Sequence, residues 1–161
     1  MNIGCTCKAC ISACWSCPGW FGSQQEIEGA AQLLNMSVPE FCKDWLIREW
    51  WVADGDDIIV PAPRRDFNRY RGKFSLKETR IMFQVDLNGS GFVAATWGHN
   101  FIRDFPCVFL TPDERCLIHE SKPQECRILH SRSRTKEPRE KIATYWRKHQ
   151  DWIDEVVKQI E

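Results

Sequence analysis

The sequence lacks an excess of charge of either sign. Its 161 residues include 22 Lys and Arg and 22 Asp and Glu, so the formal net charge is zero. Without a net field, the chain as a whole does not attract nucleic acid or an anionic membrane, and either kind of binding would need a local basic patch. We therefore expect no membrane partner and no general affinity for nucleic acid.

Long hydrophobic runs are missing as well. No stretch of 18 or more apolar residues occurs, and the N-terminus has no basic segment followed by an apolar stretch of signal-peptide length. The sequence also has no internal repeat, low-complexity tract or convincing linker. These absences predict a soluble, cytoplasmic protein with a single domain over residues 1–161, a length that buries a core without disulfides.

Cysteine, in contrast, is abundant. The chain has nine cysteines, an odd number, and in a reducing compartment such as the cytoplasm thiols seldom persist as disulfides. Thiolates are soft donors that bind zinc and iron–sulfur clusters. The cysteine content therefore favours a metal-binding protein.

Four of these cysteines lie close together near the start of the chain, at the spacing Cys7-x2-Cys10-x3-Cys14-x2-Cys17. A Cys-x-x-Cys turn lets two sulfurs converge on one metal, while neighbouring backbone amides can donate hydrogen bonds that lower the thiol pKa. We interpret all four as metal ligands and Cys5 as a further candidate. The five cysteines together are termed the first cysteine segment.

A second group of three cysteines lies far downstream, at the spacing Cys107-x8-Cys116-x9-Cys126. Prolines surround it, so we expect an irregular segment rather than a regular element. We interpret these three thiols as further ligands and term them the second cysteine segment. His119 and His130 follow closely enough to ligate a metal or to hydrogen-bond a sulfur. If the two segments share a site, the fold has to bring them together.

Two kinds of metal centre accept four thiolates, namely tetrahedral zinc and iron–sulfur clusters. Structural zinc usually joins two turns separated by a long loop, whereas only three residues separate the two Cys-x-x-Cys turns here. A four-iron cluster is larger and relaxes this constraint, and the ending Cys17-Pro18 resembles known cluster-binding runs. We therefore expect an iron–sulfur cluster. Zinc is the alternative if each turn pairs with thiols of the second cysteine segment.

Three classes of function fit a thiolate centre. The first is a binding module whose centre transfers electrons, senses redox state or serves a protein partner. The second is a metal-dependent enzyme, which would need an open coordination position and acid–base groups such as His119, Glu120 or Asp113. The third is a fold in which zinc has only a structural role. No catalytic motif supports an enzyme, so we expect the first class, with an unidentified protein partner.

Helical signals predict three helices. Ser-x-x-Glu capping boxes start at Ser23 and Ser37, ahead of helices that we expect over residues 24–35 and 38–51. Pro138 lies in the first turn of a last helix, whose apolar stripe continues to the C-terminus.

Strand signals lie between these helices. Residues 57–60 predict a short strand that Pro61 and Pro63 end. Residues 79–86 and 92–97 are rich in β-formers and flank turn residues, which predicts a β-hairpin. The predicted fold class is therefore α+β, with about three helices and a short antiparallel hairpin around cysteine-rich loops.

Several other residues have plainer expected roles. Cys42 and His149 lie on the apolar faces of predicted helices, so we expect both to pack in the core rather than ligate. Trp15 and Trp20 are expected to shield the metal from water. Residues 64–73 form a basic run with interleaved aromatics, which we interpret as a solvated face or a protein-docking surface rather than an RNA site.

Six stretches of the chain form a specific pattern together: Cys7-Lys8-Ala9-Cys10 with Cys14, Pro18-Gly19-Trp20-Phe21 with Glu26, Trp50-Trp51, Cys107-Val108-Phe109-Leu110, Cys116-Leu117-Ile118-His119, and Lys122-Pro123-Gln124-Glu125-Cys126-Arg127. The pattern resembles the YkgJ-type cysteine-cluster family, which is described as a zinc- or iron-chelating domain. The resemblance implies metal binding and specifies no substrate. The first block of that family has the form Cys-x2-Cys-x2-Cys-Cys, whereas this chain has Ala13 at the first position of the adjacent pair, and we take Cys17 as the replacement ligand.

Overall fold

The fold was analysed in a computed structural model, which describes residues 11, 14–15, 19–53, 56–64, 66, 83–84, 92–93, 106–128 and 136–160. These residues form five α-helices, a 3-10 helix and two antiparallel two-stranded sheets. The α+β class is therefore confirmed. No helix in this part of the chain is long and apolar enough to cross a membrane.

Two helices begin at serine caps, as predicted. α2 spans Gln24–Leu33, and the hydroxyl of Ser23 accepts a backbone N–H of its first turn at 3.3 Å. α3 spans Val38–Trp45 and starts with a complete capping box, in which Ser37 and Glu40 each accept the backbone N–H of the other, at 3.4 and 3.1 Å. These bonds satisfy amides that have no partner inside the helix.

The prediction that the second helix runs over 38–51 is wrong at its end. The helix stops at Trp45, and the chain continues directly as strand β1, Leu46–Ala53. Leu46 already has extended backbone angles, with φ −112° and ψ 155°. The stretch is rich in branched and aromatic residues, which fit a pleated surface, and pairing with a second strand outweighs the helical spacing of its apolar residues.

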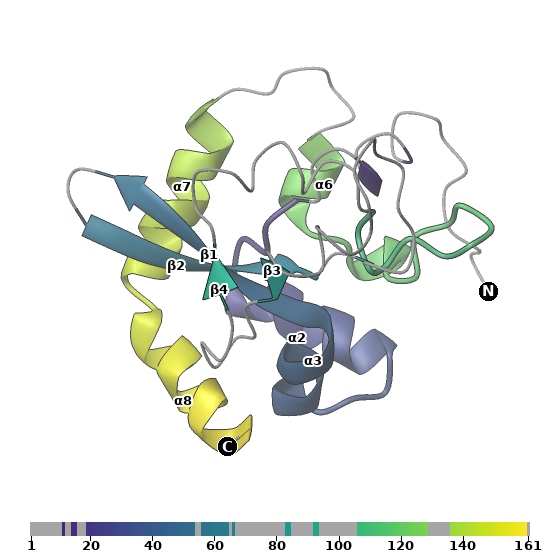
Figure 1. Ribbon diagram of the computed structural model, residues 1–161, viewed down its shortest axis with the longest axis horizontal. Coiled ribbons are helices and arrows are strands. Elements are labelled where there is room, and N and C mark those ends of the chain that lie inside the picture. The colour runs from purple at the N-terminus through teal and green to yellow at the C-terminus, as the bar shows by residue number, and fades with distance from the viewer. Residues whose placement is uncertain are drawn as a thin grey trace.

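β2 spans Asp56–Pro63 and pairs with β1 in antiparallel register. The two strands form a long hairpin that crosses the front of the molecule in Figure 1. Its register runs from Leu46 opposite Pro63 to Ala53 opposite Asp56. The strand predicted over 57–60 is therefore confirmed, but it continues through Pro61 and ends only at Pro63.

The outer edge of β2 explains why its prolines are tolerated. The side-chain amide of Gln150 accepts the N–H of Ile59 at 3.2 Å and donates to its carbonyl at 3.0 Å, and Phe21 N–H donates to the carbonyl of Pro61 at 3.1 Å. Backbone groups alternate in direction along a strand, so Pro61 and Pro63 face this same outer edge. Their missing N–H groups remove no bond between β1 and β2.

The second hairpin is present in outline. β3, Phe83–Gln84, pairs antiparallel with β4, Phe92–Val93, with Phe83 opposite Val93. Both strands fall within the stretches predicted as a hairpin, and the remainder of those stretches lies outside the described residues.

The C-terminal part forms two helices rather than the single one predicted. α7 spans Lys136–Arg147 and α8 spans Gln150–Ile160. Between them, the N–H groups of Lys148 and His149 bond to carbonyls three residues earlier, at 3.1 and 3.0 Å, which tightens the turn and ends α7. The two helices follow each other along one side of the molecule in Figure 1, where α7 packs against β2 and α8 against α3.

The second cysteine segment is more regular than predicted. It contains the 3-10 helix η2, His119–Ser121, and the short helix α6, Gln124–Ile128. Within it, α6 lies beside α7, because Glu125 on α6 pairs with Arg139 on α7 at 2.6 Å. The prediction of an irregular segment is therefore wrong for its second half, because contacts with distant residues order it, as described below.

The core between these elements is aromatic. Phe21, Phe41, Phe109 and Trp146 are at most 1% exposed. Phe109 stacks on Phe41 with ring centroids 5.8 Å apart and on Trp45 with centroids 5.2 Å apart. Burying large rings is the main apolar contribution to the stability of this fold.

Candidate functional site

The fold brings the two cysteine segments together. The carbonyl of Cys14 accepts the backbone N–H of Cys107 at 2.7 Å. The residues on either side of Cys107 bond in turn to residues 64 and 66, which follow β2, at 2.9 and 2.8 Å. Cys107 is therefore fixed between the end of the first hairpin and the first cysteine segment.

Cys116 closes a small loop of the second cysteine segment. It forms an isolated antiparallel bridge with Leu110, and the N–H of Leu117 donates to the carbonyl of Phe109 at 2.8 Å. Thr111 stabilises the turn between them, because its backbone N–H donates to the carbonyl of Arg115 at 2.8 Å and its hydroxyl accepts the N–H of Arg115 at 3.0 Å. This loop presents Cys116 next to the buried Phe109.

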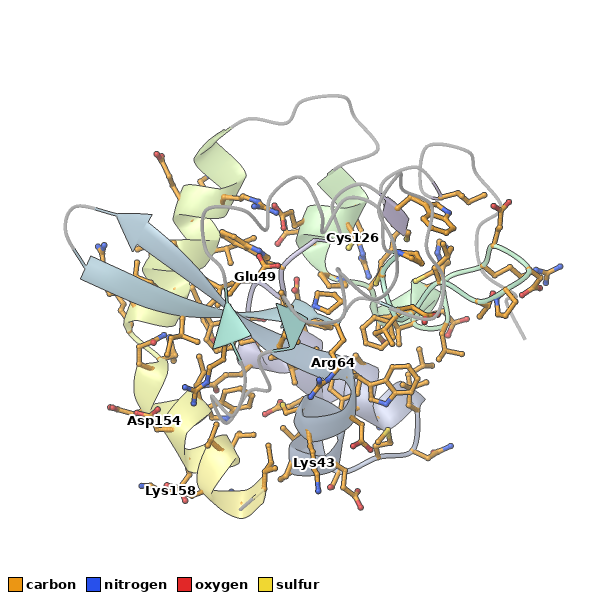
Figure 2. The ribbon with its side chains drawn as sticks, in the orientation of Figure 1. Lys43, Glu49, Arg64, Cys126, Asp154 and Lys158 are labelled. Atoms are coloured by element: carbon orange, nitrogen blue, oxygen red, sulfur yellow. The ribbon has the colours of Figure 1, made fainter. Side chains whose placement is uncertain are left out.

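Cys126 lies on α6 (Figure 2), where its thiol interacts with two other thiols. Burial is the main cause that raises its pKa, although part of the residue reaches the surface. Electrostatic interaction with Cys14, Cys116 and Glu125 raises this pKa further. A backbone hydrogen bond from Gly19 acts in the opposite direction and lowers it.

Gly19 is packed directly against Cys126. A Cβ atom at position 19 would lie 2.7 Å from both the backbone nitrogen and the sulfur of Cys126. Only glycine lets the backbone approach the thiol this closely. The close approach supplies the amide that hydrogen-bonds the sulfur, so the chain has an amide donor at the position where a thiolate would need one.

The other predicted ligands have different outcomes. Cys107 joins the site through its backbone, whereas its side chain is 5% exposed and belongs to the apolar core. His119 begins η2, its N–H donates to the carbonyl of Cys116 at 3.2 Å, and its Nδ1 is buried. Within the described residues, no three or more His, Cys, Asp or Glu side chains could hold a metal ion by themselves. The remaining predicted ligands lie outside the described residues: Cys5, Cys7, Cys10, Cys17 and His130.

Two carboxylates around α6 were not singled out by the sequence analysis. Glu26 accepts the N–H of Gly22 at 2.7 Å and that of Gln124, the first residue of α6, at 3.0 Å. Glu125 accepts the N–H of Trp20 at 2.5 Å. The sequence places both acids within the motifs of the family resemblance, but their partners are far away in the chain and no local pattern reveals them.

Of the residues with plainer expected roles, Cys42 packs in the core as predicted, His149 is only partly buried, and the shielding of a metal by Trp20 stays a prediction. Cys42 is fully buried in the apolar core, and burial raises the pKa of its thiol to about 12. His149 stacks on Tyr145 with ring centroids 4.0 Å apart, and its Nδ1 lies 2.7 Å from the carbonyl of that residue. Trp20 is 2% exposed, so it is available to exclude water from the adjacent thiol.

One of the acid–base groups considered for an enzyme, Asp113, stabilises a turn. Asp113 accepts a hydrogen bond from the hydroxyl of Thr111 at 2.6 Å and pairs with Arg115 at 3.0 Å. The bond from Thr111 is the main cause that lowers the pKa of Asp113. Its carboxylate is therefore part of the turn before Cys116.

The predicted basic face is described only at its start. The guanidinium of Arg64 donates to the backbone carbonyl of Lys43 at 2.6 Å, so this residue links the end of β2 to α3. Of the other basic residues in 64–73, none has a described side chain, and the interpretation as a solvated or docking face stays a prediction.

Comparison with known proteins identifies no family or relative of this chain. No family model matches the chain, and neither a curated protein nor a solved structure is significantly similar to it. The resemblance to the YkgJ-type family therefore rests on the sequence motifs alone.

Proposed function

We propose that this protein binds a metal centre through cysteine thiolates drawn from both cysteine segments, with an iron–sulfur cluster as the first candidate. The observation that carries the proposal is the contact between the two cysteine segments, in which the carbonyl of Cys14 accepts the backbone N–H of Cys107 at 2.7 Å. Cys7, Cys10 and Cys17 precede or follow Cys14 closely enough to complete a ligand set, and Cys107 is fixed beside it.

The electrostatics of the thiols favour a cationic occupant. Burial is the main cause that raises the pKa of Cys126, and the charges of Cys14, Cys116 and Glu125 oppose its ionisation further. A bound metal reverses this effect, because it neutralises the thiolates and displaces their protons. The amide of Gly19, aimed at the sulfur of Cys126, would stabilise the same thiolate and adjust the electron density of the centre.

Zinc is the second candidate, and one observation favours it. Structural zinc sites commonly take two ligands from each of two separated segments. The carbonyl of Cys14 from the first segment accepts the N–H of Cys107 from the second, which is compatible with such a closure. The tight spacing of the four cysteines over residues 7–17 favours the larger cluster instead.

The biological role that fits a thiolate centre of this kind is electron transfer, redox sensing or a cluster-dependent interaction with a protein partner in a reducing compartment such as the cytoplasm. Catalysis by the centre has less support. Of the acid–base groups considered for it, Asp113 is held in a turn by Thr111 and Arg115.

The first test is the content of iron, zinc and acid-labile sulfide per chain, measured on protein purified without oxygen and without added metal. Iron with matching sulfide is the expected result. Zinc without sulfide would establish the second candidate in its place. A chain that carries neither metal, and that takes up neither when both are offered under reducing conditions, would contradict metal binding.

Variants identify the ligands. Cys116→Ser and Cys10→Ser each remove one proposed ligand, one from each cysteine segment, and we expect both proteins to lose most of their metal. Cys42→Ala is the matched control, because it removes a thiol that is fully buried in the apolar core, and its metal content should equal that of the unmodified chain. Unchanged metal in both serine variants would reject the proposed ligand set.

A further inference from the structure

α6 is too short to be stable by itself. It has only five residues, from Gln124 to Ile128, and isolated helices need far more turns to offset the cost of nucleation. Its order must come from contacts outside the helix. Since α6 carries Cys126, the residues that fix α6 also fix the position of this thiol.

Glu125 supplies one of these contacts from inside α6. Its side chain is nearly buried, with 6% exposed, and its carboxylate accepts the N–H of Trp20 at 2.5 Å. The next residue, Cys126, receives the hydrogen bond from Gly19. Two successive side chains of α6 therefore hold two successive amides of the loop before α2.

Arg139 on α7 completes the arrangement. Its Nε donates to Glu125 at 2.6 Å, and its guanidinium carbon lies 4.0 Å from the centre of the Trp20 ring. The indole N–H of Trp20 donates in turn to Glu49 on β1 at 2.5 Å. Figure 2 shows Cys126 and Glu49 on these separate elements. A buried carboxylate is stable only when its charge is matched, so Glu125 needs Arg139.

We propose that Glu125 and Arg139 are positioning residues for Cys126, and that the docking of α7 is thereby coupled to metal binding. The metal part of this inference rests on the proposed function, whereas the positioning of Cys126 does not. Coupling between two equilibria is reciprocal. If the contact of Arg139 with Glu125 raises metal affinity, bound metal must strengthen the docking of α7 by the same factor.

The metal arm of the test uses zinc alone, titrated into the reduced full-length chain against a chromophoric chelator. Arg139→Gln and Glu125→Gln should each weaken zinc affinity by about 10-fold or more, the usual effect of losing a group that orients a ligand. The double variant carries two neutral amides that can still hydrogen-bond, so its loss should be smaller than the product of the two single losses. Lys158→Gln is the control, because it removes a cation from an exposed pair on α8 and should leave zinc affinity unchanged.

A second arm needs no metal. Iodoacetamide labelling of the metal-free, reduced chain is followed by mass spectrometry at a fixed pH, with Cys126 and Cys42 read separately. Arg139→Gln should raise the labelling rate of Cys126 several-fold and leave that of Cys42 unchanged. A general loss of structure would instead expose both thiols, and Arg139→Lys, which keeps the charge but not the planar fork, would then replace Arg139→Gln and should show a smaller, selective increase.

The two measurements distinguish a failure of this inference from a failure of the proposed function. Selective labelling of Cys126 in a chain that binds no zinc or iron would support the positioning residues and reject metal binding. Zinc affinity within twofold of the unmodified chain, together with unchanged labelling of Cys126, would overturn the inference while metal binding stands. Equal labelling of Cys126 and Cys42 in both arginine variants would also overturn it.

Discussion

α3 and α6 both carry a cysteine whose pKa is raised by desolvation, yet the two helices are stabilised in opposite ways. α3 contains its own start signal, because Ser37 and Glu40 cap it across three positions. α6 has its amides and side chains held by residues that are 98 and 105 positions away, through Glu26 and Trp20. A helix of the first kind can be recognised in a sequence, whereas one of the second kind exists only inside the folded protein.

The two cysteines reflect the same difference. Desolvation in an apolar core is the only cause that raises the pKa of Cys42. The pKa of Cys126 depends in addition on Gly19, Cys14 and Cys116. A thiol surrounded by hydrocarbon packs like any small apolar group, whereas a thiol surrounded by other thiols and an amide has the environment of a metal ligand.

The largest difference in stability should come from two glycine substitutions, one beside Cys126 of α6 and one within the locally capped helix α2. Gly19→Ala places a methyl group 2.7 Å from the sulfur and backbone nitrogen of Cys126, and such overpacking should cost about 1–3 kcal/mol of unfolding free energy. Gly29→Ala lies within α2, where the new Cβ meets Ser121 at an ordinary 3.7 Å, and alanine should stabilise the helix by roughly 0.5–1 kcal/mol. Urea unfolding of both variants measures the difference. Equal effects would show that the contact between Gly19 and Cys126 is not tight.

The next effect concerns the pH dependence that Cys42 confers. Folding raises the pKa of this thiol from 9.0 to about 12. Above pH 9 the unfolded chain therefore releases this proton while the folded chain keeps it, so stability is complete below pH 9 and declines as the pH rises towards 12. The slope should be about 1.4 kcal/mol per pH unit for this one group.

Urea unfolding at pH 8, 9 and 10 measures this slope in the unmodified chain and in Cys42→Ala under reducing conditions. Other titrating groups contribute equally to both proteins, so only the difference between the two slopes belongs to Cys42. Parallel slopes above pH 9 would show that the thiol is more hydrated in the folded protein than its complete burial indicates.

The smallest effect should come from the cap of α3. Ser37→Ala removes the acceptor for the N–H of Glu40 and should lower stability by about 1 kcal/mol. Because this bond stabilises α3 and not α6, the metal content of the variant should stay unchanged. Thermal unfolding and metal analysis of one preparation measure the stability and the metal content. Loss of metal in this variant would mean that α3 and the cysteine site are not independent.

Part of the fold was predictable because its signals are local. The caps at Ser23 and Ser37 gave the correct starts of α2 and α3. The end of α3 was not predictable in the same way, since residues 46–51 continue the helical spacing of apolar residues but pair with β2. Pro61 was misleading for a related reason, because proline interrupts a strand only where its N–H would face a partner strand, and β2 continues to Pro63.

The candidate site likewise has some features that the sequence predicted and others that it did not. Cysteine spacing predicted Cys14, Cys116 and Cys126 as ligands, which stays a prediction, and the structure joins the two cysteine segments through the backbone bond between Cys14 and Cys107. The spacing did not show that the side chain of Cys107 lies in the apolar core. Nor did it reveal Glu125, because a carboxylate beside a cysteine has no distinctive pattern until its distant partners are known.

The sequence by itself determined the α+β class, the serine-capped helices and the two groups of soft ligands, because each depends on residue type and short-range spacing. Only the tertiary structure decided which thiols meet, why position 19 must be glycine, and how Glu125 and Arg139 fix the short helix α6. These features depend on contacts between residues far apart in the chain, whose free energy exists only after the whole core has formed.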